Sequence, residues 1–118
     1  MGGFLLRILV SALAAMLTTY LLKPAVKIDS FVTALLLALV LALLNALVRP
    51  LLVLFTLPVT LLTLGLFLFV INAVIILLAA KIVPGFKVDG FWWAMLFSIV
   101  MTIINSVLSS LAGANNND

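Results

Sequence analysis

The segments VPGFKVDGFWWA (Val83–Ala94) and KPAVKIDSFVTA (Lys23–Ala34) decide the fold of this chain, because they spell the same loop twice. Sliding the sequence by sixty positions aligns identical residues, among them Pro24 with Pro84, Lys27 with Lys87, Asp29 with Asp89, Phe31 with Phe91, Ala34 with Ala94 and Asn45 with Asn105. Upstream the register moves by one, so that Ser11 aligns with Asn72. An internal repeat of this kind predicts a fold assembled from two similar units.

Composition sets the surroundings of the two units. Of the 118 residues 68% are hydrophobic and 8% are charged, and the mean hydropathy is +1.55. A soluble domain of this size could not bury so much apolar surface. The six Lys and Arg residues are scattered beside hydrophobic runs, which is typical of charges that flank membrane spans and not of a nucleic-acid site. We expect an integral membrane protein, with the lipid bilayer as its partner.

Four stretches are long and apolar enough to cross a bilayer, which takes about 20 residues at a rise of about 1.5 Å each. They are residues 4–22, 31–48, 59–80 and 91–111. The sequence therefore predicts an all-α, four-helix membrane bundle forming one domain over residues 1–112. The polar end of the chain, residues 113–118, is predicted to be a disordered tail.

The uncharged run of residues 51–80 is too long for one straight span, since it would measure about 45 Å against a hydrocarbon core of about 30 Å. Pro58 is the expected break, because proline removes a backbone donor and disfavours helical geometry before it. Residues 49–58 would then form a short interfacial or re-entrant helix. The alternative is a single helix that is tilted and kinked.

The aligned positions divide the chain into two helical hairpins, at about residues 4–48 and 65–108. Two spans return the chain to its starting side of the membrane. The hairpins are therefore expected to be parallel, related by an axis along the membrane normal.

Small residues recur every four positions in the second and fourth spans, which predicts close helix packing. The ladder consists of Ala34, Ala38, Ala42, Ala46, Ala94, Ser98, Thr102 and Ser106. Leu37 is expected to face lipid or a looser contact. In the alternative interpretation Ser98, Thr102, Asn105 and Ser109 form a polar stripe that faces water in a pore.

One polar side chain in each span falls in a common layer at similar distances from the repeated loops: Ser11, Asn45, Asn72 and Asn105. An amide in hydrocarbon is costly unless it is hydrogen-bonded, so these groups are expected to point inward and bond across the bundle. They could hold the helices together or form a constriction or binding site.

Two arginines mark one end of the first hairpin. Arg7 and Arg49 each lie four residues from a member of the polar layer, on the same helix face and nearer the membrane edge. The aligned positions of the second hairpin hold Leu68 and Ser109 instead. We expect the arginines to snorkel to lipid phosphate, with an anionic ligand as the alternative.

The repeated loops contain residues suited to starting and anchoring helices. Lys27 with Asp29, and Lys87 with Asp89, can each share one side of an extended segment. Each aspartate is expected to cap the helix that follows it. Aromatic rings favour the headgroup level of the bilayer, where Phe31, Phe91, Trp92 and Trp93 are expected to lie.

Two longer stretches, NALVRPLLVLFTLPVTLLTLGLF (residues 45–67) and INAVIILLAAKIVPGFKVDGFWWA (residues 71–94), carry a family resemblance. With these elements the chain, over nearly its whole length, resembles the small bacterial membrane proteins of the phage holin family, superfamily IV. The resemblance implies a four-span inner-membrane protein. Holins accumulate in the cytoplasmic membrane and open lesions that release or activate a phage endolysin.

The residues offer little for catalysis. The chain has no His or Cys, and its three acids are Asp29, Asp89 and Asp118. The serines therefore lack a base, and neither nucleophilic chemistry nor a metal site can be assembled. We expect a non-enzyme without a cofactor, metal or small-molecule substrate.

Three functions remain open. The first is a holin-like protein that forms homo-oligomers and permeabilises the cytoplasmic membrane. The second is a non-lytic structural or envelope-stress protein that binds lipid or another membrane protein. The third is a small transporter. The parallel repeat and the polar layer support it, but the sequence lacks the buried ionisable residue that a transporter is expected to carry in its spans.

Overall fold

The computed structural model describes residues 2–111, and the predicted tail at 113–118 lies outside them. The elements in chain order are α1 (Gly2–Leu22), β1 (Val26–Ile28), α2 (Phe31–Phe55), α3 (Leu57–Leu62), α4 (Phe67–Ile82), β2 (Phe86–Val88) and α5 (Phe91–Leu111). The fold is thus helical, with one short ribbon of two strands that an all-α prediction omits.

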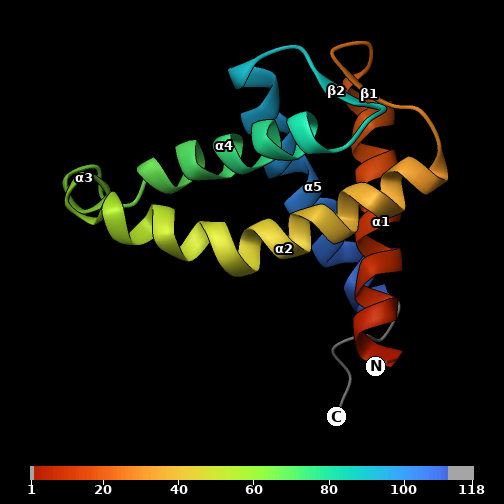
Figure 1. Cartoon of the computed structure of the whole chain (residues 1–118), viewed down its shortest axis with the longest axis horizontal. Coiled ribbons are helices and arrows are strands. Elements are labelled where there is room, and N and C mark those ends of the chain that lie inside the picture. Colours follow the sequence, from red (N-terminus) through yellow and green to blue (C-terminus); the bar gives the residue numbers. More distant parts are fainter. Residues whose placement is uncertain (1, 112–118) are drawn as a thin grey trace.

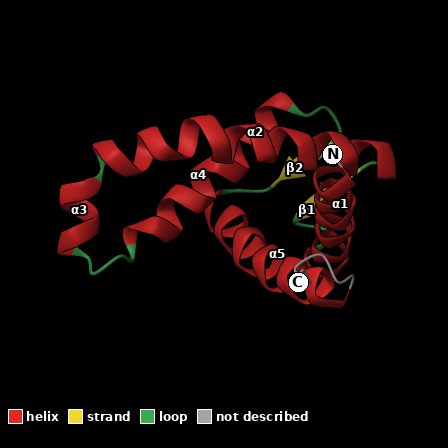
Figure 2. Cartoon of the chain, turned by 90° about the horizontal axis from the view of Figure 1, so that it is seen from below, coloured by secondary structure: helices red, strands yellow, loops and turns green. Residues whose placement is uncertain are grey.

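The long helices pack in a closed ring of pairs. Helix α1 packs against α2 and α5, and α4 packs against the same two helices. The two helices of each hairpin, α1 with α2 and α4 with α5, are therefore in contact. Figure 1 shows α1 and α5 running together toward the N-terminus, while α2 and α4 run together toward α3. The helices are close around the two strands and separate into two arms away from them (Figure 2). The molecule is therefore more splayed than a regular bundle.

Three helices, α1, α2 and α5, are long and apolar enough to cross a membrane. The fourth, α4, is equally apolar but has 16 residues, or a length of about 24 Å. The helical membrane architecture expected from the composition is confirmed.

The predicted end of the second span at residue 48 is wrong. Helix α2 continues through Pro50 to Phe55, seven residues further. Inside a bilayer no water replaces a lost backbone hydrogen bond. Ending the helix would orphan several backbone groups, whereas an internal proline removes a single donor. Helix continuation is the smaller cost.

Of the two predictions for the segment before the third span, a short helix is present but with other bounds, and the single kinked helix is wrong. The chain breaks at Thr56, just before Pro58, but the short helix α3 follows the break and does not occupy residues 49–58. Proline lies in the first turn of α3, where its missing N–H has no partner to lose. A second break follows at Leu64 and Gly65, whose φ values are 57° and 90°. These left-handed residues delay α4 until Phe67.

The two repeated loops pair with each other through β1 and β2. The strands are antiparallel, and Lys27 lies opposite Lys87, its equivalent in the repeat. Two further backbone bonds extend the pairing: the N–H of Asp29 donates to Gly85 at 3.0 Å, and that of Asp89 donates to Ala25 at 2.8 Å. The two bonds are equivalent, because a shift of sixty residues aligns Asp29 with Asp89 and Ala25 with Gly85.

The predicted capping role of the aspartates is not what the structure shows for α2. Its N-cap is Ser30, whose hydroxyl accepts a bond from the Thr33 N–H. The backbone of Asp29 is already committed to the opposite loop, which leaves the next residue at the cap position. At α5 the corresponding position is Gly90, and Asp89 is likewise bound through its backbone to Ala25.

The core lies directly beneath the strands. Leu37, Phe86 and Phe97 are buried almost completely, and the rings of the two phenylalanines are 5.3 Å apart. Leu37 therefore faces the core, contrary to expectation. The small-residue ladder is buried only at this end, at Ala34, Ala38, Ala94 and Ser98, because the helices diverge further along.

Candidate functional site

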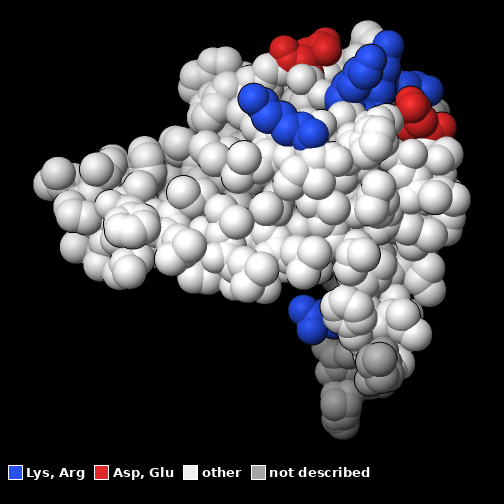
Figure 3. Space-filling view, viewed as in Figure 1, with Lys and Arg blue, Asp and Glu red and all other residues white. Residues whose placement is uncertain are grey.

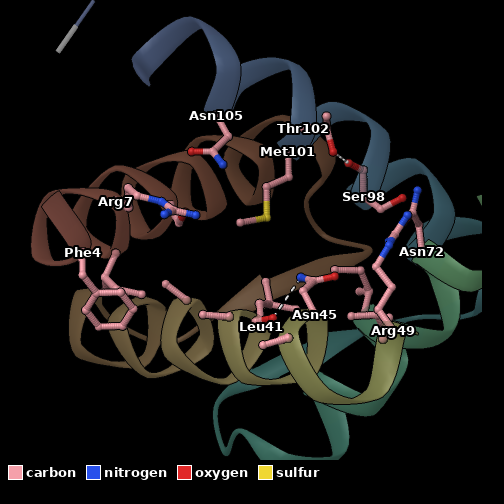
Figure 4. Close-up of a pocket in the computed structure, with 17 residues that line it drawn as sticks. Phe4, Arg7, Leu41, Asn45, Arg49, Asn72, Ser98, Met101, Thr102 and Asn105 are labelled. Atoms are coloured by element: carbon pink, nitrogen blue, oxygen red, sulfur yellow. Dashed lines mark hydrogen bonds between the residues drawn. The ribbon is translucent and has the colours of Figure 1, made fainter. Parts of the chain in front are cut away.

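A cavity of about 590 Å³ occupies the space where the two arms separate. Four helices line it, and Figure 4 shows their side chains converging from opposite sides. The polar and charged residues of the lining are Arg7 and Ser11 from α1, Asn45 and Arg49 from α2, Asn72 from α4, and Ser98, Thr102 and Asn105 from α5. All four members of the predicted polar layer and both predicted arginines thus line one cavity.

The position of the cavity follows from the chain direction of each helix. Helices α2 and α5 start at the strands, and their lining residues begin seven positions later, at Ala38 and Ser98. Helices α1 and α4 end at the strands, and their lining residues stop well before those ends, at Ser11 and Ile76. Between the cavity and the strands lies the packed core around Leu37, Phe86 and Phe97. The cavity therefore has a closed floor on the strand side.

The two arginines approach the cavity from different arms (Figure 4). Arg49 is half-buried, and its Nη1 donates to the side-chain oxygen of Asn72 on α4. This bond joins the two hairpins. Arg7 is exposed at the mouth. Arg49 therefore has a partner inside the bundle, in the Asn72 amide, whereas contact of either arginine with lipid phosphate stays a prediction.

The amides do not bond to one another as expected. Asn45 donates to the Leu41 carbonyl of its own helix at 2.9 Å, so it makes a local bond in place of a crossing one. The Oδ1 of Asn105 is buried and has no hydrogen-bond partner among the described residues. Only Asn72 bonds across helices within this layer, and its partner is Arg49. The separation of the arms explains the difference, since the amides face an open space.

The hydroxyl groups of α5 likewise bond within their helix. Thr102 donates to the carbonyl of Ser98 at 2.7 Å, and Ser98 donates to that of Met95 at 2.8 Å. These bonds are common for hydroxyls in membrane helices, and they leave the oxygen lone pairs facing the cavity. Ser98, Thr102 and Asn105 all line the cavity, as the polar-stripe alternative requires; Ser106 and Ser109 do not.

The cavity carries positive charge. It contains two guanidinium groups, and none of its lining residues in the described part of the chain is acidic. Asp29 and Asp89 lie in the loops at the opposite end, where Figure 3 shows acidic and basic side chains together. Arginine keeps its charge at any physiological pH. The site is therefore suited to an anion.

Apolar walls complete the site, and the sequence alone did not indicate them. Phe4, Ile8, Leu41, Ile75 and Met101 line the cavity between the polar groups. Such residues are indistinguishable from core or lipid-facing positions in a sequence where most residues are apolar. A cavity with apolar walls and a few convergent polar groups is the usual form of a small-molecule site.

The remaining predicted residues lie away from the cavity. Lys27, Asp29, Lys87 and Asp89 are exposed on the strands and loops. The interfacial aromatics lie at the starts of α2 and α5, and Trp92 is 75% exposed. Its ring packs edge-on against Phe91 at a centroid distance of 5.4 Å. Rings and charges thus occupy the same end of the molecule.

Comparison with known proteins gives a family match over residues 2–107, to the family described as mycobacterial 4 TMS phage holin, superfamily IV. The uncharacterized membrane protein YvlD of Bacillus subtilis is 40% identical over 85 residues, which cover 71% of each chain. The uncharacterized protein SCO3922 of Streptomyces coelicolor is 34% identical over 86 residues, covering 70% of this chain and 69% of the relative. No solved structure matches.

Proposed function

This chain belongs to the phage holin superfamily IV family of four-span membrane proteins, and from that premise we propose that it is a non-lytic, amphiphile-binding protein of the bacterial cytoplasmic membrane. Its role is to hold an anionic amphiphile in the cavity between the arms, without catalysing a reaction. This corresponds to the structural or envelope-stress alternative drawn from the sequence.

The closed floor of the cavity carries this proposal. A pore through one chain would need a polar path from one end of the helices to the other. The space between the cavity and the strands is instead filled by Leu37, Phe86 and Phe97. A cavity with apolar walls, a few convergent polar and basic groups and a packed floor on the strand side has the form of a binding site.

A two-fold relation between the hairpins is part of the proposal. It is supported by the register of Lys27 opposite Lys87 and by the matched backbone bonds of Asp29 and Asp89. The axis would pass through the ribbon and the cavity, along the membrane normal. Arg7 and Arg49 have no arginine at the equivalent positions of the second hairpin, so the positive charge of the cavity comes from the first hairpin alone.

Dye leakage from sealed liposomes tests the proposal. Purified protein is reconstituted into vesicles that contain a small fluorescent dye, at increasing protein-to-lipid ratios. We expect leakage no greater than from vesicles that carry an unrelated four-span protein, at every ratio. Leakage that rises steeply with protein density would contradict a non-lytic function.

Permeabilisation by an oligomer is the second candidate, favoured by the family and by one observation. The cavity opens to the side, and Thr102 on its α5 wall is exposed. Several copies with their open sides around one axis would line a path with Ser98, Thr102 and Asn105. In that case Thr102→Leu should abolish leakage at unchanged thermal stability, whereas Thr33→Val in the loop-proximal turn of α2 should not.

A further inference from the structure

The cavity holds two cations without a carboxylate among the residues that line it. Arg49 is half-buried, and its described side-chain partner is the neutral amide of Asn72. A buried charge without a counter-charge is costly, especially at membrane depth. We infer that the cavity binds the phosphate group of a membrane lipid. The inference rests on the proposed function, because it specifies the polar group of the bound amphiphile.

The arrangement of donors fits a phosphate. The guanidinium of Arg49 has five N–H donors in a planar fork, and the bond to Asn72 uses one of its nitrogens. The amide holds the fork on the α4 side of the cavity, and Arg7 approaches from α1 (Figure 4). The two arginines lie on opposite sides of the cavity, so a bound headgroup that fills the space between them can accept bonds from both. Charge-assisted bonds of this kind are the strong ones.

The second hairpin supplies acceptors where the first supplies cations. The positions equivalent to Arg7 and Arg49 hold Leu68 and Ser109, so no second pair of charges exists by symmetry. The α5 wall instead offers the hydroxyl groups of Ser98 and Thr102 and the amide of Asn105. A headgroup that carries a hydroxyl beside its phosphate satisfies both sides. Phosphatidylglycerol is therefore the appropriate probe.

The volume and the walls favour a lipid over a free ion. A cavity of about 590 Å³ is within the range of about 300–1,000 Å³ that accommodates small molecules. An inorganic phosphate would leave most of it empty. Phe4, Ile75 and Met101 offer an apolar surface to the glycerol backbone and the first part of an acyl chain.

Thermal-shift titration of the purified full chain in an uncharged detergent tests the inference. The probes are short-chain phosphatidylglycerol, diacylglycerol with the same acyl chains, soluble glycerol phosphate and inorganic phosphate. The variants are R49Q, R7Q and the control K87Q, which removes the same charge from β2, away from the cavity. R7Q alters an exposed side chain, so it remains informative if R49Q does not fold.

We expect phosphatidylglycerol to raise the melting temperature in a saturable way, with diacylglycerol at least tenfold weaker. R7Q and R49Q should each weaken the apparent affinity for phosphatidylglycerol by about tenfold or more, from the loss of a charge-assisted bond. K87Q should leave the affinity within about twofold of wild type, because Lys87 lies on β2, away from the cavity, and its charge is screened over that distance.

Three results would overturn the inference: equal affinity for diacylglycerol, unchanged affinity in both arginine variants, or an equal loss in K87Q. If glycerol phosphate or inorganic phosphate binds as tightly as the lipid, the claim that the ligand is a lipid is overturned, and the claim that the cavity binds a phosphate group stands. These results are independent of the leakage assay. If the vesicles leak and the protein binds the lipid, only the proposed function is contradicted. If the vesicles do not leak and the protein does not bind the lipid, only this inference is contradicted.

Discussion

Single side chains of the cavity differ in how much the sequence revealed about them. The layer of Ser11, Asn45, Asn72 and Asn105 could be predicted, because polar residues are conspicuous in an apolar helix and a rise of about 1.5 Å per residue places them at one depth. Their partners could not. Whether an amide bonds to its own helix or across the bundle depends on helix separation, which the periodicity of a sequence does not contain.

At this scale we predict that Asn45 and Asn105 contribute independently to stability. Asn45 bonds to its own helix, and Asn105 has an unpartnered oxygen, so neither loses a bond when the other changes. The changes in the free energy of unfolding caused by N45L and by N105L should add in the double variant within about 0.5 kcal/mol. Reversible denaturation in detergent measures all three.

The bonded pair of Arg49 and Asn72 provides the matched control for this cycle. R49Q and N72L should be non-additive by about 0.5–3 kcal/mol, because each removes the partner of the other. Coupling between Asn45 and Asn105 as large as that of the control pair would show that the two amides bond to each other.

Among the elements, the helix starts were easier to predict than the breaks. Residues 31 and 91 begin α2 and α5, as the turn and aromatic signals indicated. The break before Pro58 was predicted, but α2 was predicted to end too early, because Pro50 was given more weight than the cost of unpaired backbone groups in lipid. The repeated loops were predicted to start and anchor helices, and their pairing was missed because an antiparallel partner sixty residues away leaves no local signature.

We predict that Gly85→Ala destabilises the protein more than Gly65→Ala. Both glycines have φ of 90°, so both alanines are strained by a similar amount. An added Cβ at Gly85 would also lie 2.9 Å from Oδ2 of Asp29, whereas that at Gly65 meets nothing within 4 Å. The extra cost at Gly85 should be about 1 kcal/mol, the typical effect of a strained contact.

Unfolding midpoints of G85A, G65A and the double variant G85A/D29A measure this difference. The second substitution removes the carboxylate that the new methyl group meets, so it should restore part of the extra loss, while the 3.2 Å approach to Cγ2 of Thr33 remains. Equal destabilisation by the two single variants would contradict a close contact between Gly85 and Asp29.

For the whole molecule, the composition alone predicted a helical membrane protein, and the family match agrees. The splayed arms were not predicted. A small-residue ladder indicates where backbones approach, but Ala42 and Ala46 fall where the helices have already diverged and line the cavity. The angle at which two helices cross and the volume of the side chains on the facing helix decide where close packing ends. Neither can be read from the ladder itself.

The unequal helix lengths predict a preference for thin bilayers. Helix α4 is about 24 Å long, short of a hydrocarbon core of about 30 Å, and α2, with 25 residues, can tilt to adapt. Mismatch costs a fraction of a kcal/mol per ångström. We expect higher resistance to thermal unfolding in nanodiscs of short-chain phosphatidylcholine than in those of long-chain phosphatidylcholine. A protein with four spans of α2's length is the control, and equal midpoints in both lipids would contradict the prediction.

The pairing of Lys27 with Lys87 also imposes an order of events during synthesis. When the first hairpin leaves the ribosome, β1 has no partner, Arg49 has no amide to bond, and the site has half its walls. All three are completed only when the second hairpin follows, because Asn72, β2 and α5 all belong to it. Contacts between segments so distant in the chain form late. An interrupted chain therefore inserts two helices but no binding site, and α5 supplies the last wall of the cavity.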